Sequence, residues 1–242
     1  MKLSKYFGIF SGSVLAAGLI FSVAPVQAAQ LDNDARSAIP RDVQQLIVID
    51  YRAMQNSSAA MDLKARVLPP ELKQLEQALK LSGFNENNDV EELAFAAYRT
   101  GTNGENTKVV GIAQGQFSVP DILANFKKKK IKPTMIRNNQ VYPMGASGML
   151  VSFLNPTTML FGSSDAIKPA LEARDGLAQN FMTNDGMMAA MQAVDTQPLW
   201  SILDQKGTQY MMRSLLGQAS QLADYDTVKK RLLSSKIGRA HV

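Results

Sequence analysis

Short turns between apolar segments constrain the fold of this 242-residue chain most strongly. The loop 100–106 carries an Asn-Gly pair and separates two segments, 90–98 and 108–117, that are rich in apolar and β-branched residues. An Asn-Gly pair in this setting is the strongest short-range signal for a β-hairpin. Asn138-Asn139 and Asn155-Pro156 separate further pairs of short apolar segments. Strands joined by such short turns are antiparallel neighbours, so the sequence predicts an antiparallel sheet.

Helical signals stand between the predicted strands. The segment 45–51 reads as a buried strand, and Asn56-Ser-Ser58 can begin a helix that Pro69-Pro70 ends. The same prolines open a second helix, in which Leu72, Leu75 and Leu79 form an apolar stripe that ends before Gly83. A third helix is expected to begin at Ser118-Val-Pro-Asp121. This order matches a ferredoxin-like split β-α-β-β-α-β unit, so we predict an α+β fold with helices on one face of the sheet.

The second half of the chain is predicted to contain strand hairpins followed by helices. Hairpins are expected over 132–163, then a helix that begins at Ser164-Asp165 and ends near Gly176. A Met-rich helix over 185–194, a strand over 199–202 and a final helix over 207–222 complete the pattern. Residues 29–41, which are polar and small, are expected to form a loose lead-in.

The first 28 residues have the pattern of a secretory signal. Lys2 and Lys5 precede an apolar stretch over about residues 6–24, and Val26-Gln-Ala28 supplies the short side chains that a signal peptidase accepts. We therefore expect export to the periplasm or the medium with cleavage after Ala28. The alternative is an uncleaved membrane anchor, because the stretch is nearly as long as the roughly 20 residues that span a bilayer.

One segment resembles uncharacterised exported bacterial proteins. The resemblance lies in Met159-Leu-Phe-Gly-Ser-Ser-Asp-Ala-Ile167 and in Ala173-Arg-Asp-Gly176, where a strand, a Gly-Ser-Ser-Asp turn and a helix ending in Arg-Asp-Gly follow one another. It covers a small part of the chain. No activity is known to us for such proteins, so the resemblance implies no functional residues.

The last seven residues, Lys236-Ile-Gly-Arg-Ala-His-Val242, match the translation of a sequencing-library adaptor that is followed by a stop codon. We therefore expect residues 236–242 to be non-native, residues 29–235 to form one α+β domain, and the natural protein to continue beyond this fragment. A domain cut in this way should leave an unpaired strand edge or an uncovered apolar face near its C-terminus.

Composition excludes several chemistries. The chain has no Cys, and its single His, His241, lies in the adaptor-like tail, so residues 29–235 offer neither a His- or thiol-based nucleophile nor the usual zinc ligands. No cofactor or metal site is expected. The formal charge of +5 falls to about +1 when Lys2, Lys5, Lys236 and Arg239 are removed, so net charge gives no argument for nucleic acid.

One basic cluster is a candidate anion-binding site. It consists of Lys127, Lys128, Lys129, Lys130, Lys132 and Arg137. Such a cluster could bind anionic headgroups or an envelope polyanion, which would make membrane contact peripheral. The alternative is a solvated helix end, where Lys side chains favourably oppose the helix dipole.

Other candidates have ordinary structural alternatives. Gly162-Ser-Ser-Asp165 could hold an anion at a helix start but is better explained as a cap, and Gly111 to Gly115 fits close strand packing. The C-terminal methionines, which could bind copper(I), fit core packing better. Five carboxylates are the remaining option for acid–base catalysis, although surface solvation explains each of them: Asp50, Glu91, Glu92, Asp204 and Asp224.

These patterns identify no catalytic activity. They favour an exported, non-catalytic, envelope-associated binding or interaction protein of unknown ligand. The alternatives are a carboxylate-based hydrolase acting on glycans and a peripheral binder of anionic membrane through residues 127–132.

Overall fold

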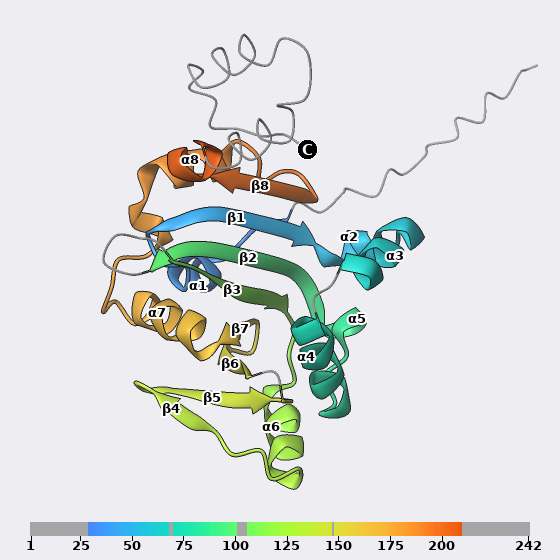
Figure 1. Cartoon of the computed structure of the whole chain (residues 1–242). Helices are drawn as coiled ribbons and strands as arrows, with labels where there is room; N and C mark the ends of the chain where they lie inside the picture. The colour runs from blue at the N-terminus through green and yellow to red at the C-terminus, as the bar shows by residue number, and fades with distance from the viewer. Residues whose placement is uncertain (1–28, 68–69, 101–105, 147, 210–242) are drawn as a thin grey trace, which may run out of the picture.

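The computed structural model describes residues 29–67, 70–100, 106–146 and 148–209. Eight strands form one antiparallel sheet in the order β4-β5-β6-β7-β3-β2-β1-β8 (Figure 1). The strands are β1 (Val43–Asp50), β2 (Val90–Thr100), β3 (Asn106–Gly115), β4 (Thr134–Ile136), β5 (Asn139–Met144), β6 (Met149–Asn155), β7 (Thr158–Ser163) and β8 (Leu199–Leu203).

The helices lie between these strands in the chain. They are α1 (Asn33–Ser37), α2 (Tyr51–Gln55), α3 (Ser58–Val67), α4 (Pro70–Leu81), α5 (Glu86–Asp89), α6 (Val119–Lys128), α7 (Ser164–Arg174), the 3-10 helix η1 (Phe181–Thr183) and α8 (Asp185–Gln192). No helix within the described residues is long and apolar enough to cross a membrane.

The α+β class with an antiparallel sheet is confirmed, whereas the ferredoxin-like pairing is wrong. A ferredoxin-like unit places its first and third strands side by side in parallel. Here β1 pairs antiparallel with β2 on one side and with β8 on the other. The reason is that helices α2 to α5 return the chain to the end of β1, where Asp50 faces Glu92, and β2 then runs back along β1.

Helices cover both faces of the sheet, so the expectation of a single covered face is also wrong. On one face, α1, α7 and α8 pack against buried strand residues such as Val48, Ala94 and Ile112. On the other face, α4 and α6 pack against β5 to β7 in a second core that includes Phe126 and Tyr142. Figure 1 shows α1 and α7 to one side of the central strands and α2 to α5 to the other. We call the face covered by α1, α7 and α8 the closed face, and the face on which α4 and α6 pack the open face.

The turn signals identified most boundaries. Strands β2 and β3 pair along ten residues as the Asn-Gly hairpin requires, although its tip, 101–105, lies outside the described residues. Gly83 and Gly176 both end helices with positive φ, at 90° and 73°. The segments 1–28 and 236–242, and the expected last helix beyond residue 209, lie outside the described residues.

Residues 29–41 are not a loose lead-in. Ala29, Ala35 and Ile39 are fully buried on the closed face. The indole Nε1 of Trp200 donates to the carbonyl of Ala29 at 2.8 Å, and Gln30 N donates to Glu92 Oε1 at 3.0 Å. Small apolar side chains and these long-range bonds order a segment whose composition looked like a linker.

Candidate functional site

An apolar groove crosses the open face of the sheet, with a volume of about 910 Å³. Its floor belongs to strands β2, β3, β6 and β7 and is made by Leu93, Phe95, Val109, Gly111, Met149 and Phe161. Helices α2, α3 and α4 form one wall, and Pro198 and Leu199 line it beside β1. The groove is open to solvent, because Val109 in its floor is 50% exposed and Leu199 at its side is 46% exposed.

Glycine shapes this floor. Gly111 of β3 lies opposite Phe161 of β7, and a Cβ on Gly111 would come within 2.1 Å of the Phe161 ring. The ring therefore lies across the β3 backbone, where it meets Phe95 edge-to-face with centroids 5.9 Å apart. The interpretation of Gly111 to Gly115 as close packing is consistent with this, since a Cβ on Gly115 would lie 1.8 Å from the carbonyl oxygen of Asp89.

Asp50 fixes the start of the helical wall. Its Oδ1 accepts a hydrogen bond from Ala53 N at 2.8 Å and caps α2, and its own N–H donates to the carbonyl of Pro198 at 2.6 Å. Asp50 is only 7% exposed. The expectation of a solvated Asp at a strand end is therefore wrong, because a capping carboxylate can be buried when backbone N–H groups satisfy it.

A polar cluster holds α3 against α4 and α5 behind the groove. Lys64 Nζ donates to Tyr51 Oη at 2.9 Å and to Glu86 Oε1 at 2.9 Å, and it lies 3.3 Å from Glu76 Oε2. It also lies 5.1 Å from the centroid of the Tyr51 ring. These contacts tie the four helices α2, α3, α4 and α5 together through one ammonium group.

Burial and the bonds of this cluster shift its titrations. Burial raises the pKa of Tyr51 to about 12, against the opposing effect of its bond with Lys64. Burial lowers the pKa of Lys64, but its hydrogen bonds to Tyr51 and Glu86 outweigh burial and leave that pKa above its usual value. Burial and the negative charge of Glu86 raise the pKa of Glu76. Lys64 is therefore a cation at neutral pH.

Sequence reasoning missed this cluster. Ala60 and Lys64 are four residues apart and so share one face of α3, which lines the groove. This four-residue spacing was the sign in the sequence that Lys64 lies on the same side of α3 as Ala60. The partners Glu76 and Glu86 are 12 and 22 residues away along the chain, at distances that no helical periodicity predicts.

The candidate carboxylates do not converge in the groove. Glu91 pairs with Arg52 at 2.6 Å, and Asp204 pairs with Arg99 at 2.7 Å. Glu92 is opposite Asp50 in the β1–β2 register, but it shares the closed face with Ala94 and is not among the groove-lining residues. Asp224 lies outside the described residues.

Glu92 nevertheless has an unusual environment. It accepts hydrogen bonds from Gln30 N at 3.0 Å and from Gln114 Nε2 at 2.9 Å. Burial, with the nearby charges of Asp50, Glu91 and Asp32, raises its pKa to about 7, although the bond from Gln30 N acts in the opposite direction. This network joins Gln30 of the N-terminal segment to β2 and β3 at one end of the closed face.

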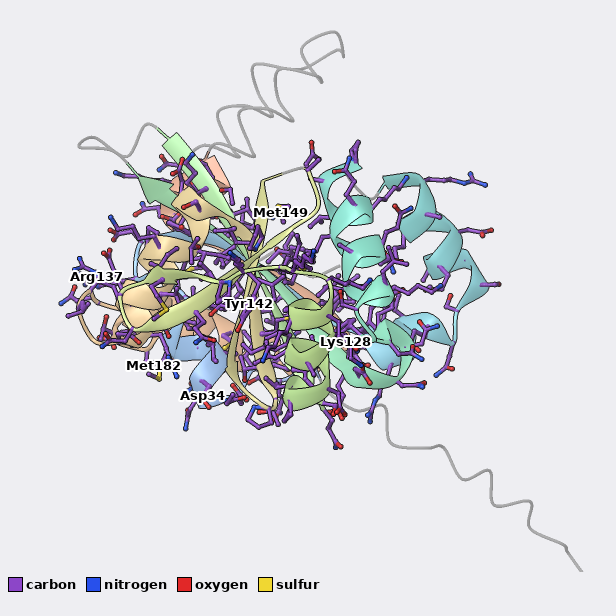
Figure 2. All side chains as sticks on the ribbon, turned by 90° about the horizontal axis from the view of Figure 1, so that it is seen from below. Asp34, Lys128, Arg137, Tyr142, Met149 and Met182 are labelled. Carbon is purple, nitrogen blue, oxygen red and sulfur yellow. The ribbon has the colours of Figure 1, made fainter. Side chains whose placement is uncertain are left out.

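The basic cluster is divided by the fold. Lys127 and Lys128 form the last turn of α6, and Lys129, Lys130 and Lys132 follow it; all five side chains are exposed. Arg137 lies in the β4–β5 turn and pairs with Glu172 of α7 at 3.1 Å. Figure 2 shows Arg137 and Lys128 on different sides of Tyr142. The lysines therefore gather at the end of one helix, and Arg137 does not join them.

The remaining sequence candidates occupy structural positions. Ser163 precedes α7 as its cap residue without a side-chain cap hydrogen bond, although Asp165 pairs with Lys108 at 3.2 Å. Met187 and Met191 of α8 are buried in the core of the closed face. Within the part of the chain that the structure describes, no cluster of three or more His, Cys, Asp or Glu residues could hold a metal ion.

No protein-family model matches the sequence, and no curated protein matches it. Structures of three crystal forms (I, III and IV) of the protein TP0453 are similar, with 11%, 11% and 10% sequence identity and TM-scores of 0.42, 0.38 and 0.35. The matches cover 78%, 77% and 74% of this chain and 68%, 68% and 66% of the other. A likeness of this degree assigns neither an activity nor a ligand to this chain.

Proposed function

We propose that this protein is an exported binding protein that holds an amphiphilic small molecule, with the hydrocarbon part of the ligand in the groove of the open face. The observation that carries the proposal is the groove itself, about 910 Å³ in volume and lined mainly by apolar side chains. Sites for small molecules typically have volumes of about 300–1,000 Å³ and this kind of lining.

The exposed floor favours an apolar occupant. Val109 and Leu199 are about half exposed, while Leu93 and Phe95 beside them are only partly buried. Apolar surface removed from water contributes roughly 25 cal/mol per Å², so a hydrocarbon chain laid on this floor would be stabilised along its whole length. The groove lies in the concave space between the sheet and α2 to α4, which suits a chain-like ligand better than the surface of a folded partner.

Binding without catalysis is supported by the arrangement of the acids. The carboxylate with the raised pKa, Glu92, belongs to the closed face, and Asp50 is engaged in capping α2. A hydrolase would need two carboxylates to flank a bond of the substrate in one cleft. The groove instead offers contact area with few polar side chains.

The test is a fluorescence titration of the purified full chain with a neutral naphthylamine dye that emits in apolar surroundings. We expect saturable binding with one site per chain. Val109→Asp places a charge on the floor and should weaken binding by roughly tenfold or more, because the buried carboxylate must be desolvated. Met135→Asp is the matched control, since Met135 is also an exposed strand residue (58%) and lies outside the groove.

Two outcomes would overturn the proposal. Dye binding that Val109→Asp and Met135→Asp change equally would place the dye elsewhere on the surface. A chain that forms a stable dimer in light scattering, and binds dye only when Val109→Asp breaks the dimer, would show that a second copy covers this face.

A further inference from the structure

We infer that the C-terminal end of α6 docks the protein on a bilayer surface that carries anionic phospholipid headgroups. The contact surface, which we call the lysine end, consists of Lys127, Lys128, Lys129, Lys130 and Lys132. All five side chains are exposed. The lysine end lies away from the groove lining, so this inference does not depend on a ligand in the groove.

The charge around the lysine end is of one sign. Residues 122–164 contain six Lys or Arg residues and no Asp or Glu. This segment includes most of α6 and all of β4 to β7. Helix α6 and strands β4 and β5 lie together at the β4 edge of the sheet (Figure 1). One end of the molecule is therefore basic although the net charge is small, and each Lys held near an anionic bilayer strengthens binding about fivefold.

The five lysines form no ion pair within the described residues. Basic side chains elsewhere do, since Arg52, Arg99 and Lys108 each pair with an acid from a distant segment. Arg137, the sixth basic residue of 122–164, pairs with Glu172. An external anion can therefore bind the lysine end without breaking an ion pair of the described fold.

Backbone hydrogen bonds hold the lysine end in a defined turn. Ile131 N donates to the carbonyl of Phe126 at 2.9 Å, and Lys130 N donates to the carbonyl of Lys127 at 3.0 Å. This pair of bonds is the Schellman motif, which ends a helix with one residue in the left-handed region. That residue is Lys130, with φ of 58°. Ile131 then packs against the core of the open face.

Lysine is unfavourable at this position. The same two bonds end α4 and α7, and there the left-handed residues are Gly83 and Gly176. Glycine is favoured because a Cβ crowds the backbone in this region. The helix dipole accounts for cations in the last turn of α6, but it does not account for lysine in place of glycine after that turn. Strained residues of this kind gather at functional sites, and here the strain adds a positive charge to the surface.

Exposed apolar side chains beside the lysines favour a bilayer over a nucleic acid. Met135 of β4 is 58% exposed, and Pro133 is exposed as well. Apolar side chains among lysines can enter the boundary between headgroups and acyl chains while the ammonium groups bind phosphate. Single-stranded nucleic acid is held by aromatic rings, and none of the exposed large apolar side chains in the described part of the chain is aromatic.

Co-sedimentation of the full chain with vesicles tests the inference. One set of vesicles is pure phosphatidylcholine, and the other contains phosphatidylcholine and phosphatidylglycerol in equal parts. We expect roughly tenfold tighter binding to the mixed vesicles, with most of this difference lost at high salt. Residues 1–28 carry an apolar stretch and two lysines of their own, so the differences between variants assign the binding to the lysine end.

Lys130→Gly separates charge from stability. Glycine relieves the left-handed strain, so the melting temperature should rise by about 2 °C, while the lost charge should weaken binding to mixed vesicles about fivefold. The double variant Lys127→Gln, Lys128→Gln should weaken it roughly twentyfold. The matched control is Lys73→Gln, Lys80→Gln, which removes two exposed lysines of α4 and should leave binding almost unchanged.

Three outcomes would overturn the inference. The first is equal binding of the wild type to the two kinds of vesicle. The second is an equal loss in the two double variants, or a Lys130→Gly protein that is more stable and binds as tightly as the wild type. The third is lysine-dependent binding of a single-stranded oligonucleotide more tightly than of the mixed vesicles, which would identify nucleic acid as the partner.

Discussion

The two faces of the sheet have similar apolar character but are covered to different degrees. On the closed face, Ala94 and Ala96 of β2 are fully buried beneath helices. On the open face of the same strand, the larger Leu93 and Phe95 are only partly buried. Tyr98 of the same strand face is buried as well, and its Oη donates a hydrogen bond to the carbonyl of Ala166 in α7 at 2.5 Å.

This difference shows that side-chain size and burial are separate properties. A strand face with alanines can be the better covered one, because a helix packs close to it and leaves no gap. A face with Phe and Leu can stay open when the nearest helices lie to one side. Large apolar side chains on an open face are then a sign of binding, and small ones on a closed face are a sign of packing.

The largest expected effect on stability comes from a cavity on the closed face. Leu160→Ala removes a fully buried side chain and should lower the free energy of unfolding by about 3 kcal/mol, with little change in dye affinity. Phe95→Ala on the open face should cost about 1–2 kcal/mol and weaken dye binding. Urea unfolding and dye titration of both variants check the comparison.

Equal losses of stability in the two variants, or loss of dye binding in Leu160→Ala alone, would contradict the distinction between the faces. Such a result would mean that the floor of the groove contributes to the core as much as the closed face does.

Local signals in the sequence predicted the elements of both faces. Turn pairs such as Asn155-Pro156 and the apolar stripe of Leu72, Leu75 and Leu79 identified strands and helices near their observed bounds. The pairing of β1 with β8 could not be predicted, because about 150 residues separate them and no turn joins them. The α+β class therefore followed from local turns, and the order of strands required the long-range contacts.

The sequence predicted little of the candidate site. A strand was expected over 90–98, but a strand pattern alone could not show that the face carrying Leu93 and Phe95 is the less covered one. Lys64 gave no sign of its partners, and the densest charge cluster, 127–130, lies away from the groove lining. A groove arises from what helices leave uncovered, and single-residue patterns do not record it.

The next effect concerns the shape of the open face. Gly111→Ala should lower the free energy of unfolding by about 1–3 kcal/mol and displace the Phe161 ring, because the new Cβ would overlap the ring. Gly186→Ala is the control, because the atom nearest to an added Cβ would be 3.8 Å away. Gly186 lies in α8, where alanine stabilises the helix by roughly 0.5–1 kcal/mol relative to glycine.

Thermal unfolding distinguishes these two glycine variants. A second change, Phe161→Leu, should recover part of the stability that Gly111→Ala loses, since the shorter side chain leaves room for the Cβ. A Gly111→Ala protein as stable as the wild type would show that the ring does not need to lie across β3.

The smallest effect concerns Glu92, at the margin of the closed face. Because burial raises its pKa from 4.5 to about 7, the folded chain holds this proton more tightly than the unfolded chain does. The resulting stabilisation is complete below about pH 4 and is lost as the pH rises through 7. Glu92→Gln removes this titration. Between pH 4 and pH 8 the stability of the variant relative to wild type should therefore increase by about 1–2 kcal/mol, after allowing for partial solvent screening. Urea unfolding at both pH values measures the change. A constant difference would mean that water reaches Glu92 freely, and that the closed face is open at this end.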